Sequence, residues 1–202
     1  MATIVVGGHS RSVGKTSVVA GIIAALPAQQ WTAVKITQFG HGICSVNGKS
    51  CHCAVDEHTV ALSEERDRSG KSDTSRFLVA GASRALWVRT KQGHLAEAMP
   101  ALRQRLAEAA NVIMESNSVM RFLHPDIYLS VLDHATADFK PSAREFLDFA
   151  DALLVHESES TPQWRDLPIN PVQNKLQFAI SPPHYVTPEL IAWLRHKLNL
   201  AA

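Results

Sequence analysis

The glycine-rich segment from Gly7 to Ser17 constrains the fold of this chain more than any other part of its sequence. It reads Gly-Gly-His-Ser-Arg-Ser-Val-Gly-Lys-Thr-Ser, and it lies between the apolar run Thr3–Val6 and a helical pattern at Lys15–Leu26. A glycine-rich turn between a strand and a helix directs backbone N–H groups toward one point, and the helix adds its positive dipole end. The segment is therefore predicted to bind phosphate groups.

Two side chains in this loop have predicted chemical roles. Lys15 is expected to reach the β- and γ-phosphates of a nucleotide, and the Thr16 hydroxyl is expected to bind Mg²⁺. Arg11 is a candidate contact as well, with a solvated surface arginine as the alternative. The predicted nucleotide contacts are Gly8, Ser10, Arg11, Ser12, Val13, Gly14, Lys15, Thr16 and Ser17.

Apolar runs alternate with helical patterns along the whole chain, which predicts an α/β protein with a mainly parallel sheet. With 202 residues, of which 46% are hydrophobic, the chain suits one domain over 1–202. The expected strands are Thr3–Val6, Trp31–Thr37, Arg84–Arg89, Asn111–Glu115, Ile127–Leu132, Ala152–Val155 and Leu176–Ile180. The expected helices are Lys15–Leu26, Ser72–Ala80, Leu95–Ala110, Ser142–Ala150 and Pro188–Leu198.

Three further polar residues are expected near the phosphate loop, because ligands of open α/β sheets bind at the carboxyl ends of the strands. Glu115 ends a buried strand and is a candidate Mg²⁺ ligand. Asp73 is either a second Mg²⁺ ligand or the N-cap of its helix. Lys35 ends the second strand and is a candidate catalytic residue that neutralises charge on a transferred phosphoryl group, with a surface lysine as the alternative.

The loop 40–58 contains all three cysteines of the chain and is an insertion rich in cysteine and histidine. Cys44, Cys51 and Cys53 are predicted metal ligands, with His52, His41 or His58 as the fourth. Zinc and an iron–sulfur cluster both suit this soft ligand set. Reduced cysteines without a metal are the alternative, because Cys-x-Cys is less diagnostic than paired Cys-x-x-Cys motifs.

Charge and hydropathy exclude two classes of partner. The formal net charge of +1 provides no general basic field, so we expect no nucleic-acid partner. The apolar stretch Val18–Leu26 is shorter than the roughly 20 residues needed to cross a bilayer, so we expect no membrane association. The N-terminal residues lack a basic signal segment, which predicts a cytoplasmic protein.

Several motifs resemble the molybdopterin-guanine dinucleotide biosynthesis protein B (MobB) family of P-loop proteins. That family has a lysine at the end of the second strand followed by a histidine-rich loop, and the segment from Lys35 to His41 is similar. The segment from Lys71 to Ala82 resembles its Lys-Asp-Ser, helix, Ala-Gly-Ala pattern, and Met114-Glu115-Ser116 resembles its Val-Glu-Gly. Ser116 replaces the glycine of that motif. The resemblance implies a three-layer P-loop NTPase fold.

The phosphate loop also resembles that of dethiobiotin synthetases. Five residues separate Gly8 from Gly14, and both this longer spacing and the ending Val-Gly-Lys-Thr are similar to that family. The acidic residue that the family has between its glycines is absent here. The resemblance implies, as an alternative, an ATP-dependent ligase or kinase.

We therefore expect a Mg²⁺-dependent NTPase or phosphoryl-transfer enzyme in cofactor or metal-centre biosynthesis, including that of the molybdenum cofactor. A nucleotide-gated metallochaperone or adaptor with little turnover is a further alternative. Both resemblances imply a homodimer, and the first implies a client protein in cofactor assembly. ATP and GTP remain open. The purine is expected between the loops that begin at His156 and Ser181.

Overall fold

The first strand, β1 (Thr3–Gly8), is buried on both of its faces. Ile4 and Val6 pack into one hydrophobic core, whereas Val5 packs into a second core on the opposite side. Successive side chains of a strand point to opposite faces, so a strand with consecutive apolar residues must be covered on both sides. The apolar run at the N-terminus thus forms the centre of the sheet.

A computed structural model describes residues 1–39, 59–158, 163–164 and 174–199 of the chain. Its other strands are β2 (Trp31–Phe39), β3 (Val60–Glu64), β4 (Arg84–Lys91), β5 (Asn111–Glu115), β6 (Ile127–Leu132), β7 (Ala152–His156) and β8 (Leu176–Ile180). These strands form one eight-stranded sheet in the order β3-β4-β2-β5-β1-β6-β7-β8. All neighbours are parallel except β3 and β4.

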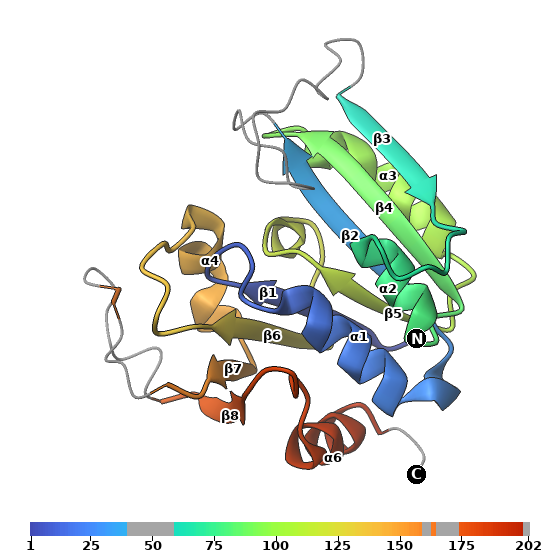
Figure 1. Cartoon of the computed structure of the whole chain (residues 1–202). Coiled ribbons are helices and arrows are strands. Elements are labelled where there is room, and N and C mark those ends of the chain that lie inside the picture. Colours follow the sequence, from blue (N-terminus) through green and yellow to red (C-terminus); the bar gives the residue numbers. More distant parts are fainter. Residues whose placement is uncertain (40–58, 159–162, 165–173, 200–202) are drawn as a thin grey trace.

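Helices cover both faces of this sheet (Figure 1). The helices α1 (Lys15–Ala25), α2 (Asp73–Val79) and α6 (Pro188–Lys197) contribute to the core that contains Ile4, whereas α3 (Leu95–Leu106) and α4 (Pro141–Phe146) contribute to the core that contains Val5. Short 3₁₀ helices lie at Pro27–Gln29, Ser118–Arg121 and Leu147–Phe149. The expected three-layer α/β architecture with a mainly parallel sheet is confirmed.

The structure differs from the sequence prediction at three elements. The edge strand β3 was not expected. The helix predicted over Leu95–Ala110 ends at Leu106, where the amides of Ala107 and Ala109 each bond a carbonyl three residues back rather than four. The helix predicted over Ser142–Ala150 is α4 followed by the 3₁₀ turn Leu147–Phe149.

No helix within the described ranges is both long and apolar enough to cross a membrane. The loop 40–58, including the predicted metal ligands Cys44, Cys51, Cys53 and His52, lies outside those ranges.

Candidate functional site

The end of β1 is held in place by Asn117, which follows β5. The Asn117 side chain accepts a hydrogen bond from the Gly8 N–H at 2.8 Å and donates one to the Gly8 carbonyl at 2.9 Å. A Cβ atom at Gly7 would lie 2.1 Å from Oδ1 of Asn117 and 2.4 Å from the hydroxyl of Tyr128. Residue 7 must therefore be glycine for this brace to form.

The turn from the loop into α1 depends on a second glycine. Gly14, at the N-cap of α1, has a φ of +90°, a backbone conformation that other residues rarely adopt. A Cβ atom at Gly14 would also lie 2.2 Å from a ring carbon of Tyr185. No described side chain caps the first turn of α1, so its N–H groups are available to an anion.

Lys15 begins α1, and its ammonium group forms a hydrogen bond with the backbone of the phosphate loop. Its Nζ donates to the backbone carbonyl of Ser10 at 2.6 Å. Burial lowers the pKa of Lys15 to about 8, against the opposing attraction of Glu115. No carboxylate within the described residues forms an ion pair with Lys15, so its positive charge is available to a phosphate group.

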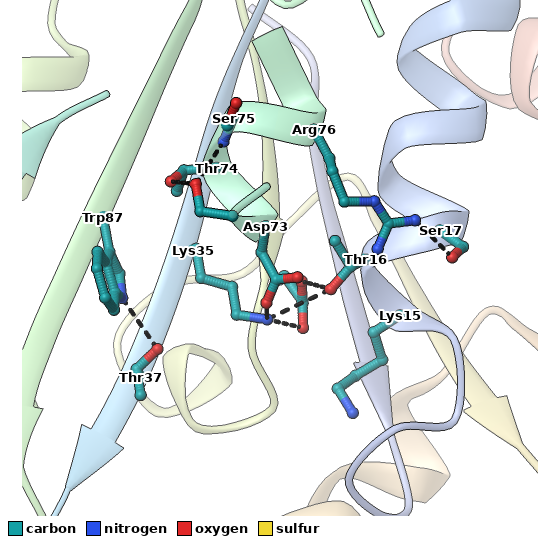
Figure 2. Close-up of polar contacts among 12 residues, drawn as sticks. Lys15, Thr16, Ser17, Lys35, Thr37, Asp73, Thr74, Ser75, Arg76 and Trp87 are labelled. Carbon is teal, nitrogen blue, oxygen red and sulfur yellow. Dashed lines mark hydrogen bonds and ion pairs between the residues drawn. The ribbon is translucent and has the colours of Figure 1, made fainter. Parts of the chain in front are cut away.

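Four other predicted residues meet beside this lysine. The Thr16 hydroxyl donates to Oε2 of Glu115 at 2.8 Å. The Lys35 ammonium lies 2.5 Å from Oε1 of Glu115, 2.7 Å from Oδ2 of Asp73 and 3.4 Å from Oγ1 of Thr16. Figure 2 shows the side chains of Lys35, Asp73 and Thr16 converging from β2, α2 and α1. With Glu115 at the end of β5, four elements far apart in the sequence thus build one polar cluster.

The register of the sheet explains this convergence. Lys35 on β2 is aligned with Glu115 on β5, and Glu115 is aligned with Val6 on β1. All three strands are parallel, so their carboxyl ends reach the same edge, where the phosphate loop begins. Glu115 is 4% exposed and Lys35 is 18% exposed, so this ion pair is largely shielded from solvent.

The charge state of the cluster follows from two opposing effects on Lys35. Burial alone would lower the pKa of Lys35, but the adjacent carboxylates of Glu115 and Asp73 outweigh it and raise the pKa above the ordinary lysine value. Lys35 is therefore a cation at neutral pH. A cation already occupies the point toward which Thr16, Asp73 and Glu115 direct their oxygen atoms.

The two alternatives for Asp73 are distinguished by the start of α2. The N-cap is Ser72, whose hydroxyl accepts the Ser75 N–H at 3.1 Å. The N-cap alternative for Asp73 is therefore wrong: Asp73 occupies the first turn, and its carboxylate contacts Lys35. From the same helix, Arg76 donates to the Ser17 hydroxyl at 3.0 Å (Figure 2).

Several residues around the phosphate loop were missed by sequence reasoning. Asn117 lies 109 positions from Gly8, and His9 contacts the carbonyls of Val131 and Thr136 more than 120 positions away. Burial lowers the pKa of His9, which is fully buried. No local spacing marks such partners. The Met114-Glu115-Ser116 motif, one residue before Asn117, was the nearest available signal.

His156, at the start of one loop expected to hold the purine, and Tyr185, just after the other, both lie against the phosphate loop. A ring nitrogen of His156 lies 2.9 Å from the Val13 carbonyl, and its ring centroid lies 5.8 Å from that of Tyr185. Tyr185 in turn lies against Gly14. A cavity of about 910 Å³ extends from Ser17 along α1, and the segment from Pro183 to Pro188 forms part of its wall. Its lining includes Ser17 but none of the residues from Gly7 to Thr16, so the cavity runs along α1 and not over the phosphate loop.

No protein-family model matches the chain, and no curated protein matches its sequence. LpxK from Aquifex aeolicus, solved in complex with ATP, is a similar structure, with 14% identity and a TM-score of 0.51. The likeness covers 89% of this chain and 53% of that one, so this chain spans about half the length of the LpxK chain.

Two other solved structures match with lower scores. HypB from Helicobacter pylori, in complex with nickel, has 12% identity and a TM-score of 0.48, covering 98% of this chain and 86% of that one. The signal recognition particle receptor FtsY from Elizabethkingia anophelis, in complex with GDP, has 16% identity and a TM-score of 0.43, covering 92% and 58%. At such identities structural likeness concerns the fold alone. The chain has the α/β fold of P-loop NTPases.

Proposed function

We propose that this protein binds a nucleoside triphosphate with Mg²⁺ and hydrolyses it or transfers its terminal phosphoryl group. The observation that carries the proposal is the cluster of Thr16, Lys35, Asp73 and Glu115 beside Lys15. Phosphoryl transfer needs positioning and positive charge around the phosphates more than it needs covalent chemistry. The loop amides and the two lysines supply these requirements. LpxK, which has a similar fold, was solved in complex with ATP, and this agrees with a nucleoside triphosphate as the ligand.

The donor atoms of the cluster suit Mg²⁺. Thr16 offers a hydroxyl oxygen, and Asp73 and Glu115 offer carboxylate oxygens, which are the hard ligands that this ion prefers. The Lys35 ammonium among them demonstrates that the cluster accommodates a positive charge. When bound, Mg²⁺ would neutralise negative charge on the β- and γ-phosphates.

Each lysine has a distinct role in this proposal. Lys15 leaves the Ser10 carbonyl and binds phosphate oxygens, while the loop amides hold the same group from the other side. Asp73 and Glu115 would hold Mg²⁺ in place of the Lys35 ammonium, and Lys35 would then be available to stabilise charge that develops on the transferred phosphoryl group. Both steps exchange an internal contact for one with the ligand.

The finer assignments remain proposals. A role in cofactor or metal-centre biosynthesis rests on the MobB-like motifs at Lys35–His41, Lys71–Ala82 and Met114–Ser116. The dethiobiotin-synthetase-like alternative rests on the long spacing of the phosphate loop. A homodimer and a client protein follow from the same resemblances. Light scattering at micromolar concentration, with nucleotide present, tests the dimer directly.

Turnover tests the proposed activity. Phosphate release is measured from ATP and from GTP, with Mg²⁺ and with EDTA, for the wild type, Lys15→Met and Lys197→Met. Lys197 is an exposed lysine on α6 and serves as the matched control. We expect Mg²⁺-dependent release that falls about 100-fold or more in Lys15→Met and is unchanged in Lys197→Met. Equal rates in Lys15→Met and the wild type would refute the proposal.

A further inference from the structure

The segment from Asp133 to Lys140 follows β6 and is attached to the outside of the phosphate loop. The Lys140 N–H donates to the His9 carbonyl at 2.8 Å. The Ser10 hydroxyl donates to Oδ2 of Asp138 at 2.7 Å. Two consecutive residues of the phosphate loop thus hold this segment, so the position of Lys140 is tied to that of the loop.

An aromatic cluster anchors the same segment. The buried ring of His9 lies 5.1 Å, between centroids, from both Phe139 and Trp164, and these two rings lie 5.6 Å apart. Aromatic contacts at such separations stabilise a packed arrangement. Phe139 immediately precedes Lys140, so the backbone at Lys140 is fixed from two directions.

Lys140 is a partly buried cation without a counterion. Within the described part of the chain its ammonium forms no hydrogen bond or ion pair. Burial lowers the pKa of Lys140, and repulsion from Arg11 lowers it further, although Asp138 and Glu115 attract its charge. Lys140 also repels the charge of Lys15. The hydrogen bond from its backbone to the His9 carbonyl places Lys140 next to the phosphate loop.

Lys140 and Lys35 approach this site from opposite sides. Lys35 belongs to β2, beyond β5 on one side of β1, whereas Lys140 follows β6 on the other side. Lys35 already has two carboxylate partners, whereas Lys140 forms no ion pair with any described carboxylate. A partly desolvated cation near other cations is unfavourable unless an anion binds to it.

We propose that Lys140, with Arg11 beside it, binds an anionic oxygen group of a second substrate, a phosphate or a carboxylate, next to the nucleotide. The inference rests on the proposed function and adds the chemical class of its acceptor. An anionic acceptor is repelled by a nucleoside triphosphate, and positive charge on the acceptor side offsets that repulsion. Arg11 is exposed at the tip of the loop and adds charge on this side.

Calorimetry with inorganic phosphate as the probe tests this subsite. The protein is first saturated with Mg²⁺ and a non-hydrolysable triphosphate analogue, and phosphate is then titrated into the complex. We expect saturable phosphate binding in the wild type and in Lys197→Met, weakened about tenfold in Lys140→Met. Arg11→Met should weaken phosphate binding in the same direction, which guards against a local folding defect at Lys140.

The affinity for the analogue identifies the source of the bound anion. If Lys140 binds the second substrate, Lys140→Met should weaken phosphate binding by a larger factor than it weakens analogue binding. A larger loss of analogue affinity would place Lys140 on the terminal phosphate of the nucleotide and overturn the inference. Absence of saturable phosphate binding to the analogue-loaded wild type would overturn it as well. Failure of the analogue to bind at all would instead refute the proposed function.

Discussion

The ammonium nitrogen of Lys35 lies 2.5 Å from Oε1 of Glu115, at the point where the sequence predicts a magnesium ion. Glu115 is almost completely buried, and its other oxygen accepts the Thr16 hydroxyl. A buried carboxylate needs a nearby positive charge, and in the free protein Lys35 supplies it. The candidate nucleotide site is therefore stabilised, in the free protein, by one of its own proposed catalytic residues.

Replacing Lys35 by methionine should expose this dependence. Glu115 loses its counterion in Lys35→Met, so we expect the free energy of unfolding to fall by about 3 kcal/mol. Because the ammonium no longer occupies the cluster, Mg²⁺ without nucleotide should raise the melting temperature of Lys35→Met more than that of the wild type. Thermal unfolding with and without Mg²⁺ measures both effects. An equal response to Mg²⁺ in the two proteins would contradict the shared site.

The lowered pKa of Lys15 predicts a pH-dependent affinity for nucleotide. Below about pH 8 Lys15 carries its proton with or without ligand. Above that pH the free protein loses the proton, and binding a triphosphate must restore it, so the affinity should fall by up to about tenfold per pH unit. Calorimetry over this range measures the change. Lys15→Arg stays charged throughout, and should show no step near pH 8.

The lowered pKa of Lys15 also predicts how the stability of the ligand-free protein changes with pH. The folded-state pKa of Lys15, about 8, is below the ordinary value of 10.5, so the unfolded chain binds more protons between these two values. The free energy of unfolding of the ligand-free protein should therefore gain a contribution from Lys15 as the pH rises from about 8 to 10.5. Urea unfolding of the wild type and Lys15→Arg, compared across this range, isolates that contribution.

The contact between Gly7 and Asn117 predicts an unusual cost for a small substitution. A methyl group at residue 7 would lie 2.1 Å from Oδ1 of Asn117, so Gly7→Ala must break the brace on Gly8. We expect a loss of about 3 kcal/mol in stability, from unpaired polar groups and local strain. Gly93→Ala is the control, because its φ of +86° adds strain but no atom lies within 4 Å. It should cost only about 1 kcal/mol. Similar losses in the two variants would contradict this account.

Local patterns in the sequence predict most of the fold and the central residues of the candidate site. Strands buried on both faces, such as Asn111–Glu115 and Ile127–Leu132, are mainly apolar segments, and their predicted bounds agree with the structure. Parallel strand ends meet at one sheet edge, which is why Lys35 and Glu115 could be predicted to lie near the phosphate loop.

Features that depend on distant contacts could not be predicted in this way. The edge strand β3 is only partly buried, and its alternation of Val60, Ala61, Leu62 and Ser63 is a weak signal for a strand. The positions of Asn117 and Lys140 depend on hydrogen bonds across the sheet to Gly8 and His9. No spacing between neighbouring residues encodes these pairs.

The predicted metal site at the cysteines concerns residues outside the described ranges, and the metal content of the purified protein tests it. Cys44, Cys51 and Cys53 are expected to bind one zinc ion or an iron–sulfur cluster. Elemental analysis and the visible spectrum of protein purified without oxygen or chelator should detect the metal, and replacing all three cysteines by serine should abolish it. Metal content that is unchanged by this replacement would contradict the prediction.

The most direct test of the central claim is a double-mutant cycle on Thr16 and Glu115, with nucleotide affinity measured by calorimetry in Mg²⁺ and in EDTA. Both residues are proposed to act through the same ion, so Thr16→Val and Glu115→Gln should each remove most of the Mg²⁺-dependent gain in affinity. We expect the wild type and Lys197→Met to bind at least about tenfold more tightly with Mg²⁺, and the double variant to lose no more than either single variant. Full Mg²⁺ dependence in the double variant, or no nucleotide binding by the wild type, would contradict the account.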